Sequence, residues 1–396
     1  MKIVILAVIL AAQWAGYHAY TSTSQSRSHI RNIHATRKMI VHNPRMHIFN
    51  PMKDSHIYPW KTMMAPSSTN DAPLISTSLK MTESSADSSK SLTEKLKVGT
   101  YFGLWYGFNI AYNIYNKKVL NQVPGLTYTV GFLQLFIGLI YVVPLWLSGV
   151  RAAPSLTNSE IKSLIPVTIC HALTHLGAIV SLGAGAVSFT HIVKAAEPAV
   201  SAFLSAVFAK SFLPIPVYLT LLPVMGGVAL ASLGELSFSM LAFMSAMISN
   251  VASASRGIVG KEVLKKPPGK NMSPMNLYAV MTILSAIFCL PVALALEGNA
   301  IVPTIQALVE AGTHKKFYLE TVLSAITYYL YNEVAFLALD SVAPVTHALG
   351  NTIKRVVIIL TSVIVFGTKL TNQGAIGSAI AIVGVLLYSL AKDYFK

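Results

Sequence analysis

The segment VSFTHIVKAAEPAV, residues 187–200, lies within a long apolar run and yet contains His191, Lys194 and Glu197. A charged side chain near the centre of a membrane helix raises the free energy of insertion by roughly 2.5–3.5 kcal/mol. If this run spans a membrane, its charged side chains need partners, and the rest of the sequence must show what those partners are.

The composition assigns this run to a membrane protein. Of the 396 residues, 54% are hydrophobic and 11% are charged, and the mean hydropathy is +0.58. Soluble domains carry about 25% charged residues, whereas this length accommodates about ten spans of ~20 residues and a tail. The net charge of +15 does not indicate nucleic-acid binding, because no soluble basic domain carries it. The two cysteines lack metal-ligand spacing, and we expect no cofactor.

From residue 98 onward, apolar segments alternate with short breaks rich in Pro, Gly, Asn and charged residues. This alternation predicts an all-α integral membrane protein, in contact with a lipid bilayer through about ten transmembrane helices. The expected helices are 98–117, 127–149, 160–182, 187–208, 213–232, 237–258, 274–295, 317–338, 343–366 and 372–391.

An internal repeat divides these helices into two sets. AVSFTH precedes GGVALAS in the first half, and VAPVTH precedes VGVLLYS in the second half, at offsets of 156 and 157 residues. Because five is an odd number of spans, the second set must cross the membrane in the opposite sense to the first. We therefore expect two inverted five-helix repeats, at residues 95–234 and 235–396.

The first quarter of the chain has the composition of a targeting sequence. Lys2, an apolar core and small residues up to Ala19 are the layout of a signal peptide over residues 1–19, with an uncleaved signal anchor as the alternative. The following 20–94 are rich in Ser and Thr, and no acidic residue occurs before Asp54, which predicts a transit peptide and a disordered tail. This order resembles the bipartite presequence of proteins imported into complex plastids.

Three cations lie too deep in the expected spans to reach the membrane surface easily. Lys194 is in the fourth span, and the adjacent Lys354 and Arg355 are near the middle of the ninth. Pairing within the protein could involve Glu197 and Glu333, but two carboxylates leave one cation without a partner. The alternative is an anion site in a water-filled cavity. An Arg fork and a Lys point charge together suit phosphate oxygens.

Helical spacing supports the anion site, because the three cations belong to two polar stripes. The stripes lie at equivalent places in the two repeats, so we expect them to face each other. One stripe contains Thr190, Lys194, Glu197 and Ser201, and the other contains His347, Asn351, Lys354 and Arg355.

His175, Tyr331 and Arg256 are weaker candidates for the same site. A His in an apolar helix is often a core residue, a Tyr can simply fill the bundle, and an Arg near a helix end can extend to the membrane surface. The sequence contains no P-loop, paired catalytic carboxylates, nucleophile elbow or zinc-ligand spacing. We therefore do not expect an enzyme.

Four motifs resemble the plastid triose-phosphate/phosphate translocator family, within the drug/metabolite transporter superfamily. The resemblance extends from about Leu104 to Lys392. The motifs are VSFTHIVKAAEP (187–198), SNVASASRGIVGKE (249–262), YLYNEVAFLALDSVAPVTHALGNTIKR (329–355) and NQGAIGSAIAIVGVLLYSLAK (372–392).

The resemblance implies ten helices in two inverted repeats and an antiporter in a plastid envelope membrane. Such proteins exchange inorganic phosphate for phosphorylated C3, C5 or C6 compounds. The residues that match the family's phosphate site are Lys194, Lys354 and Arg355. His175 and Tyr331 match two further substrate-binding positions, and Arg256 matches the residue that accepts the carboxylate of 3-phosphoglycerate.

Two residues depart from the family pattern. Ala178 replaces the Ser or Thr of triose-phosphate members, as in hexose-phosphate members, and Glu333 replaces an amide. Tyr331 and Glu333 are about 200° apart on a helix, so Glu333 should face away from the site. VAPVTHALGN is closest to the triose-phosphate type, which favours a C3 substrate.

We therefore expect a multi-pass antiporter of phosphate and phosphorylated C3 compounds that works by alternating access. It should reside in the envelope of a complex plastid, as a monomer or a dimer. The alternatives are a phosphoenolpyruvate or sugar-phosphate exchanger, and a proton-coupled metabolite exporter with Glu197 or Glu333 as the proton site.

Overall fold

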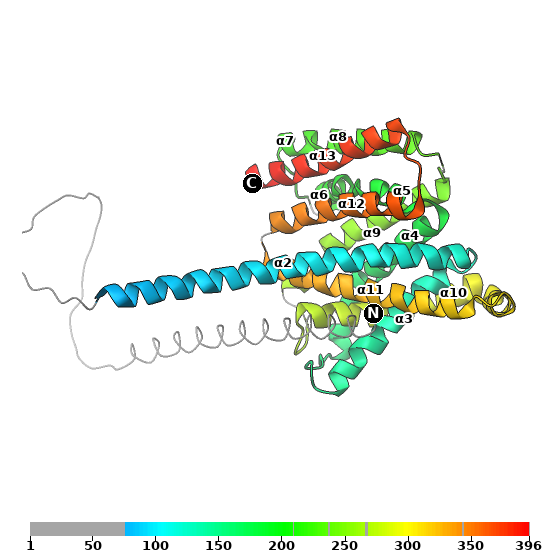
Figure 1. Ribbon diagram of the computed structural model, residues 1–396, viewed down its shortest axis with the longest axis horizontal. Coiled ribbons are helices and arrows are strands. Elements are labelled where there is room, and N and C mark those ends of the chain that lie inside the picture. Colours follow the sequence, from blue (N-terminus) through cyan, green and yellow to red (C-terminus); the bar gives the residue numbers. More distant parts are fainter. Residues whose placement is uncertain (1–75, 209, 237, 266–267, 343, 396) are drawn as a thin grey trace, which may run out of the picture. The chain divides into compact units, whose positions relative to one another are not determined.

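A computed structural model describes residues 76–208, 210–236, 238–265, 268–342 and 344–395 of the protein. Within these ranges the chain is helical and forms no strand (Figure 1). The expected signal peptide and most of the expected transit peptide, at 1–75, lie outside the described residues.

The described residues form helices α2 to α13, and the fold class expected from the sequence is confirmed. Two pairs of short helices, α5 with α6 and α7 with α8, each make up one stretch of spanning length. The bounds are α2 Ser76–Gln122, α3 Thr127–Leu147, α4 Asn158–Ala184, α5 Val187–Lys194, α6 Glu197–Phe208, α7 Ile215–Leu219, α8 Leu221–Leu233, α9 Met240–Lys265, α10 Pro274–Glu310, α11 His314–Ser341, α12 Pro344–Phe366 and α13 Asn372–Tyr394.

Eight of these stretches are long and apolar enough to cross a membrane, whereas α2 and α9 are not. Both of the exceptions bury polar side chains inside the bundle, and these residues lower their hydropathy. They include Asn109 and Asn113 in α2, and Ser249 and Asn250 in α9. The polarity of these two helices is thus explained by what they face in the protein.

Helix α2 begins at Ser76, whereas the sequence predicted a tail up to residue 94. Residues 76–97 contain neither Pro nor Gly, so local propensity allows a helix there. The expectation of a tail was based on the lack of apolar residues, which argues against burial but not against a local helix.

Sequence signals at the helix termini explain several boundaries. Thr157 precedes α4 and forms a capping box, in which its backbone N–H donates to Glu160 (2.7 Å) while its hydroxyl accepts from the Glu160 N–H (3.4 Å). Ser273 and Thr371 accept from the backbone at the starts of α10 and α13. Each of these cap residues lies in a polar break, and the next helix begins directly after it.

The fourth span, expected as one helix over 187–208, is interrupted. Helix α5 ends at Lys194 and α6 begins at Glu197. Pro198 explains the interruption, because its ring would collide with the carbonyl of Lys194 in a continuous helix and its nitrogen has no hydrogen to donate. The break therefore places Lys194 at a helix end.

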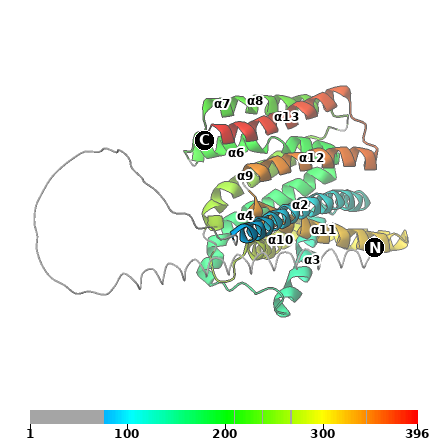
Figure 2. The ribbon, with the colours of Figure 1, turned by 60° about the vertical axis from the view of Figure 1, so that its left-hand side comes forward.

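Helices α8 and α13 lie side by side, each from a different half of the chain (Figures 1 and 2). Some of the other contacts match between the halves: α3 packs on α11 as α10 packs on α4, and α3 packs on α4 as α10 packs on α11. Such pairs are what a two-fold relation between two five-helix sets requires. The repeat boundaries at 95–234 and 235–396 stay a prediction.

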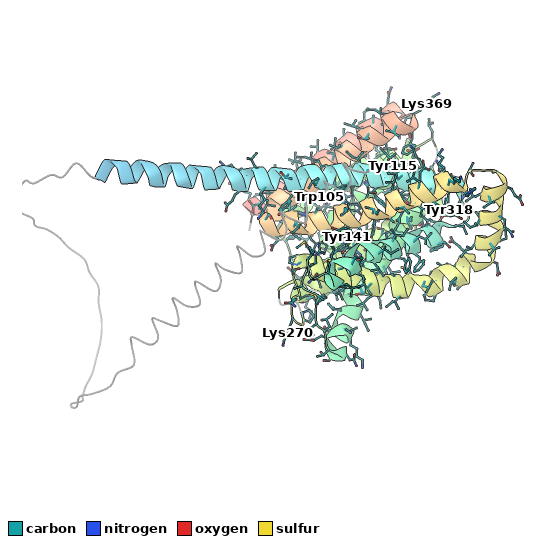
Figure 3. The ribbon with its side chains drawn as sticks, turned by 60° about the horizontal axis from the view of Figure 1, so that its bottom comes forward. Trp105, Tyr115, Tyr141, Lys270, Tyr318 and Lys369 are labelled. Carbon is teal, nitrogen blue, oxygen red and sulfur yellow. The ribbon has the colours of Figure 1, made fainter. Side chains whose placement is uncertain are left out.

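The helices run in alternating directions, so their ends define two faces of the bundle (Figure 1). The first face contains the ends of α3, α9 and α11 and the start of α12. The second face contains the ends of α2, α4 and α12. On the first face, the backbone of Ser155 bonds with that of Lys270, the latter labelled in Figure 3 (3.0 and 3.1 Å).

Candidate functional site

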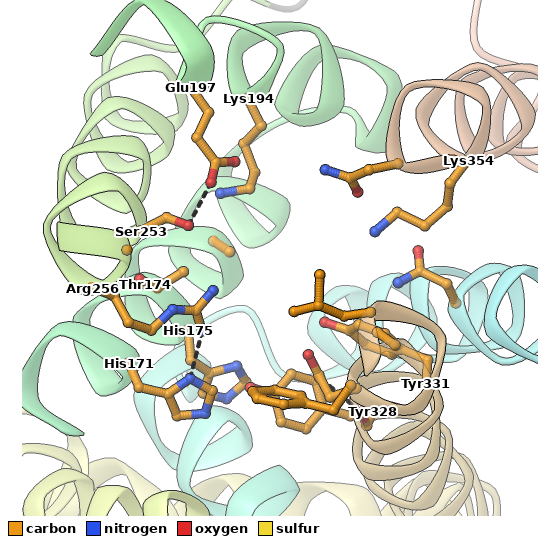
Figure 4. A pocket seen from close by; sticks show the side chains of 18 of the residues that line it. His171, Thr174, His175, Lys194, Glu197, Ser253, Arg256, Tyr328, Tyr331 and Lys354 are labelled. Carbon is orange, nitrogen blue, oxygen red and sulfur yellow. Dashed lines mark hydrogen bonds between the residues drawn. The ribbon is translucent and has the colours of Figure 1, made fainter. Parts of the chain in front are cut away.

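A cavity of about 480 Å³ lies between the two halves of the bundle. Side chains from α2, α4, α5, α6, α9, α10, α11 and α12 line it (Figure 4). The structure brings together all six residues that the sequence singled out, since the lining includes His175, Lys194, Arg256, Tyr331, Lys354 and Arg355.

The cavity extends toward the first face and stops short of the second. Its lining reaches Val263 and Leu339, which lie within three residues of the ends of α9 and α11. Toward the second face it ends at Leu182, which belongs to a buried apolar cluster with Val187 and Ile358. The structure therefore represents a state that is closed at the second face by apolar packing.

Lys194 lies at the end of α5 and donates from its Nζ to the hydroxyl of Ser249 in α9 (2.7 Å). That hydroxyl in turn donates to the backbone carbonyl of Thr174 in α4 (2.7 Å). Among the described residues, no carboxylate forms a salt bridge with Lys194. Its ammonium is thus oriented by a hydroxyl, and its charge is not neutralised by an ion pair.

Arg355 pairs with Glu197 across the two halves, with 2.9 Å between Nη2 and Oε2. Ser253 in α9 donates to the other carboxylate oxygen of Glu197 (2.5 Å). The guanidinium is buried, whereas the Glu197 side chain is 26% exposed, so the ion pair is only partly shielded from water. Glu197 is therefore bound from α9 and α12 at once.

Glu333 does not line the cavity and instead forms a buried ion pair with Arg151, in the loop after α3. This agrees with the helical-wheel argument that Glu333 faces away from Tyr331. Pairing of Glu333 with the three deep cations, considered from the sequence, does not occur. The lining formed by the described residues contains Glu197 as its one carboxylate and four cationic side chains, Lys194, Arg256, Lys354 and Arg355.

Lys354 lies against aromatic rings instead of a carboxylate. Its Nζ is 4.7 Å from the ring centroid of Trp105 and 6.0 Å from that of Tyr331. Trp105 also stacks on His347, with 4.8 Å between the ring centroids and 13° between the planes. A cation–π contact stabilises the ammonium in place while leaving its full charge available to an anion.

His175 and Arg256 each form a hydrogen bond on the α4 side of the cavity. His175 donates from Nε2 to the carbonyl of Gly131 (3.0 Å), and its ring packs on Tyr328 with 4.4 Å between centroids. Arg256 donates from Nη1 to Nδ1 of His171 (2.8 Å). Arg256 lines the cavity, and so the alternative in which it extends to the membrane surface does not apply.

The sequence profile of the Triose-phosphate Transporter family matches residues 96–389. The chain belongs to the triose-phosphate transporter family. It is 42% identical over 299 residues to a triose phosphate/phosphate translocator of Pisum sativum, covering 75% of this chain and 73% of that protein. It is 40% identical over 300 residues to glucose-6-phosphate/phosphate translocator 2 of Arabidopsis thaliana, covering 76% of each.

A third relative is phosphoenolpyruvate/phosphate translocator 1 of Oryza sativa subsp. japonica, 38% identical over 312 residues, covering 78% of this chain and 75% of that protein. Relatives with different substrates in their names are thus similarly distant from this chain. Membership of a transporter family confirms the prediction that the protein is not an enzyme.

None of the site residues expected from the sequence belongs to α2, although α2 lines the cavity with Trp105, Asn109 and Asn113. Their spacing of four residues puts them on one helix face, a signal available in the sequence. Asn113 accepts from Nε2 of His191 (2.8 Å) and donates to the Asn109 carbonyl (2.8 Å). His171, four residues before His175, was also missed.

Proposed function

We propose that this protein is an antiporter that exchanges inorganic phosphate for phosphorylated C3 compounds, triose phosphate and 3-phosphoglycerate, across a plastid envelope membrane by alternating access. The observation that carries the proposal is the charge of the cavity. Four cations and one carboxylate line it within the described part of the chain, so it suits a small anion of high charge.

Lys194, Lys354 and Arg355 are the proposed phosphate ligands. Lys194 belongs to α5 in the first half, and Lys354 and Arg355 belong to α12 in the second half. Within the described residues, neither lysine forms an ion pair with a carboxylate. An Arg fork can bind two phosphate oxygens while each Lys supplies a point charge. His175 and Tyr331 are proposed to contact the remainder of the substrate, and Arg256 its carboxylate.

Exchange without net transport follows from the same charges. Closing the first face over an unoccupied site would enclose an excess of cations at low dielectric, which is costly. A phosphate group with a charge near −2 offsets most of that excess. The loaded carrier can therefore close and reopen at the second face, whereas the unoccupied carrier remains open.

The preference for C3 compounds is supported by the motif VAPVTHALGN at residues 342–351, which resembles the triose-phosphate type. Ala178 lines the cavity where triose-phosphate members have Ser or Thr, and it leaves phosphoenolpyruvate or sugar-phosphate exchange as the alternative. A proton-coupled exporter would need a carboxylate free to titrate. Glu197 and Glu333 are both paired with arginines, which weighs against that alternative.

The expected location, an envelope membrane of a complex plastid reached by a bipartite presequence, remains part of the proposal. It is supported by the composition of the first quarter of the chain and by relatives named as chloroplastic. We propose a monomer as the functional unit because one cavity forms between the two halves of a single chain.

Variants of the phosphate ligands test the proposal. In liposomes loaded with phosphate, Lys194→Ala or Arg355→Ala should lower phosphate exchange by about 100-fold or more. Each substitution removes a cation that would bind the phosphate group inside the cavity. Lys315→Ala is the matched control, since Lys315 is exposed at the start of α11. Exchange at the wild-type rate by either cavity variant would refute the assignment of the site.

A further inference from the structure

His171 lines the cavity and contacts Arg256, although it is not among the proposed phosphate ligands. Its Nδ1 accepts a hydrogen bond from Nη1 of Arg256 (2.8 Å). A guanidinium can only donate, so Nδ1 carries no hydrogen and the ring hydrogen is on Nε2. The structure therefore shows a neutral imidazole that serves as an acceptor for a cation.

The imidazole is held rigidly where it meets Arg256. His171 is 2% exposed, and its ring lies edge-on to Tyr278, with 5.9 Å between the centroids and 88° between the planes. It belongs to α4, which packs closely along α9, the helix that carries Arg256. An acceptor fixed in this way restricts a side chain that otherwise has several rotatable bonds.

Besides this contact with His171, Arg256 lines the cavity (Figure 4). Arg256 follows Ser249, the hydroxyl partner of Lys194, by seven residues, which is about 10 Å along α9 toward the first face. Figure 4 shows Lys354 on the opposite wall of the cavity. Arg256 therefore faces the part of a bound molecule that is remote from the phosphate ligands.

We propose that His171 is a positioning residue that fixes Arg256 for a carboxylate remote from the substrate phosphate. It thereby sets the preference of the site for phosphorylated C3 acids over C3 phosphates that have no carboxylate. The physical reason is that a two-point contact between guanidinium and carboxylate depends on the orientation of the fork. This inference rests on the proposed function.

The test compares 3-phosphoglycerate with dihydroxyacetone phosphate as external substrates for vesicles loaded with phosphate. His171→Leu should raise the ratio of the KM for 3-phosphoglycerate to that for dihydroxyacetone phosphate by about tenfold, through loss of a hydrogen bond to a charged group. His171→Asn should restore most of the wild-type ratio, because its amide oxygen can accept in place of Nδ1. His314→Leu, in a residue that does not line the cavity, is the control and should leave the ratio unchanged.

A double-mutant cycle separates positioning from a general effect on folding. In an Arg256→Ala background, His171→Leu should change the KM ratio by less than about twofold, because no guanidinium is left to orient. An unchanged ratio in the single variant, or an equal rise in both backgrounds, would overturn the role of His171 while phosphate exchange persists. Absence of phosphate exchange in the wild-type protein would overturn the proposed function and this inference together.

Discussion

Glu197 determines how much positive charge the cavity presents to an entering anion. It binds Arg355 at 2.9 Å and accepts from Ser253 at 2.5 Å. If Arg355 binds phosphate as proposed, the phosphate must compete with this carboxylate or share the guanidinium with it. At the scale of single residues, the affinity of the site is therefore set by an internal anion as well as by the cations.

Glu197→Gln removes this competing charge and preserves the shape of the side chain. We expect the KM for phosphate to fall about fivefold, since a partly exposed ion pair contributes about 1 kcal/mol. The measurement is phosphate exchange at graded external phosphate, with the exposed Glu310→Gln as a control. A KM that rises would mean that Glu197 orients Arg355 for the substrate and does not compete with it.

The partner of Glu197 could not be predicted from the sequence. Lys194 is three residues away and was the natural candidate, whereas Arg355 is separated from Glu197 by 158 positions. The break between α5 and α6 puts the two neighbours on different helices, and tertiary packing brings α12 to Glu197. That six of the lining residues share one cavity was predictable from residue type and motif, but the pairing of Glu197 with Arg355 depends on the fold.

At the scale of helices, α8 and α13 pack through glycines. A Cβ added at Gly227 would lie 2.3 Å from the backbone nitrogen of Ala381, while a Cβ at the adjacent Gly226 would meet nothing within 4 Å. Backbone atoms cannot move aside as a flexible side chain can. The close approach of the two helices therefore requires glycine at position 227 and not at position 226.

Gly227→Ala should destabilise the protein by roughly 1–3 kcal/mol, the cost of overpacking. Its unfolding temperature should fall by roughly 2–10 °C, measured by thermal unfolding of the purified protein in detergent. Gly226→Ala is the matched control on the same helix and should not lower this temperature. Equal effects at both positions would contradict the packing of α8 on α13.

The starts of α4, α10 and α13 were predictable from the sequence, because Thr157, Ser273 and Thr371 mark starts that local chemistry controls. The expected end of the span at 295 was wrong, since α10 continues to Glu310. The interruption before Glu197 was also encoded, by Pro198, but the apolar run around it concealed the signal. The lining contributed by α2 was not predicted, because Trp105 and Asn109 are ordinary residues of a bundle until the opposite helices are known.

At the scale of the whole molecule, the two halves form one cavity with an excess of cations that is closed at one face. The match to the Triose-phosphate Transporter family covers residues 96–389, and therefore both halves. We propose that an anion must occupy this cavity before the carrier can change the face to which it opens. Transport by one half in isolation, or by an unoccupied carrier, is not compatible with that claim.

The most direct measurement of this claim is uptake of labelled phosphate into liposomes that contain the full chain. The vesicles are loaded with phosphate, dihydroxyacetone phosphate, 3-phosphoglycerate, phosphoenolpyruvate or glucose 6-phosphate, or are left empty. We predict rapid uptake only into loaded vesicles, fastest with dihydroxyacetone phosphate or 3-phosphoglycerate among the organic compounds. Equal uptake into empty vesicles would contradict obligatory exchange.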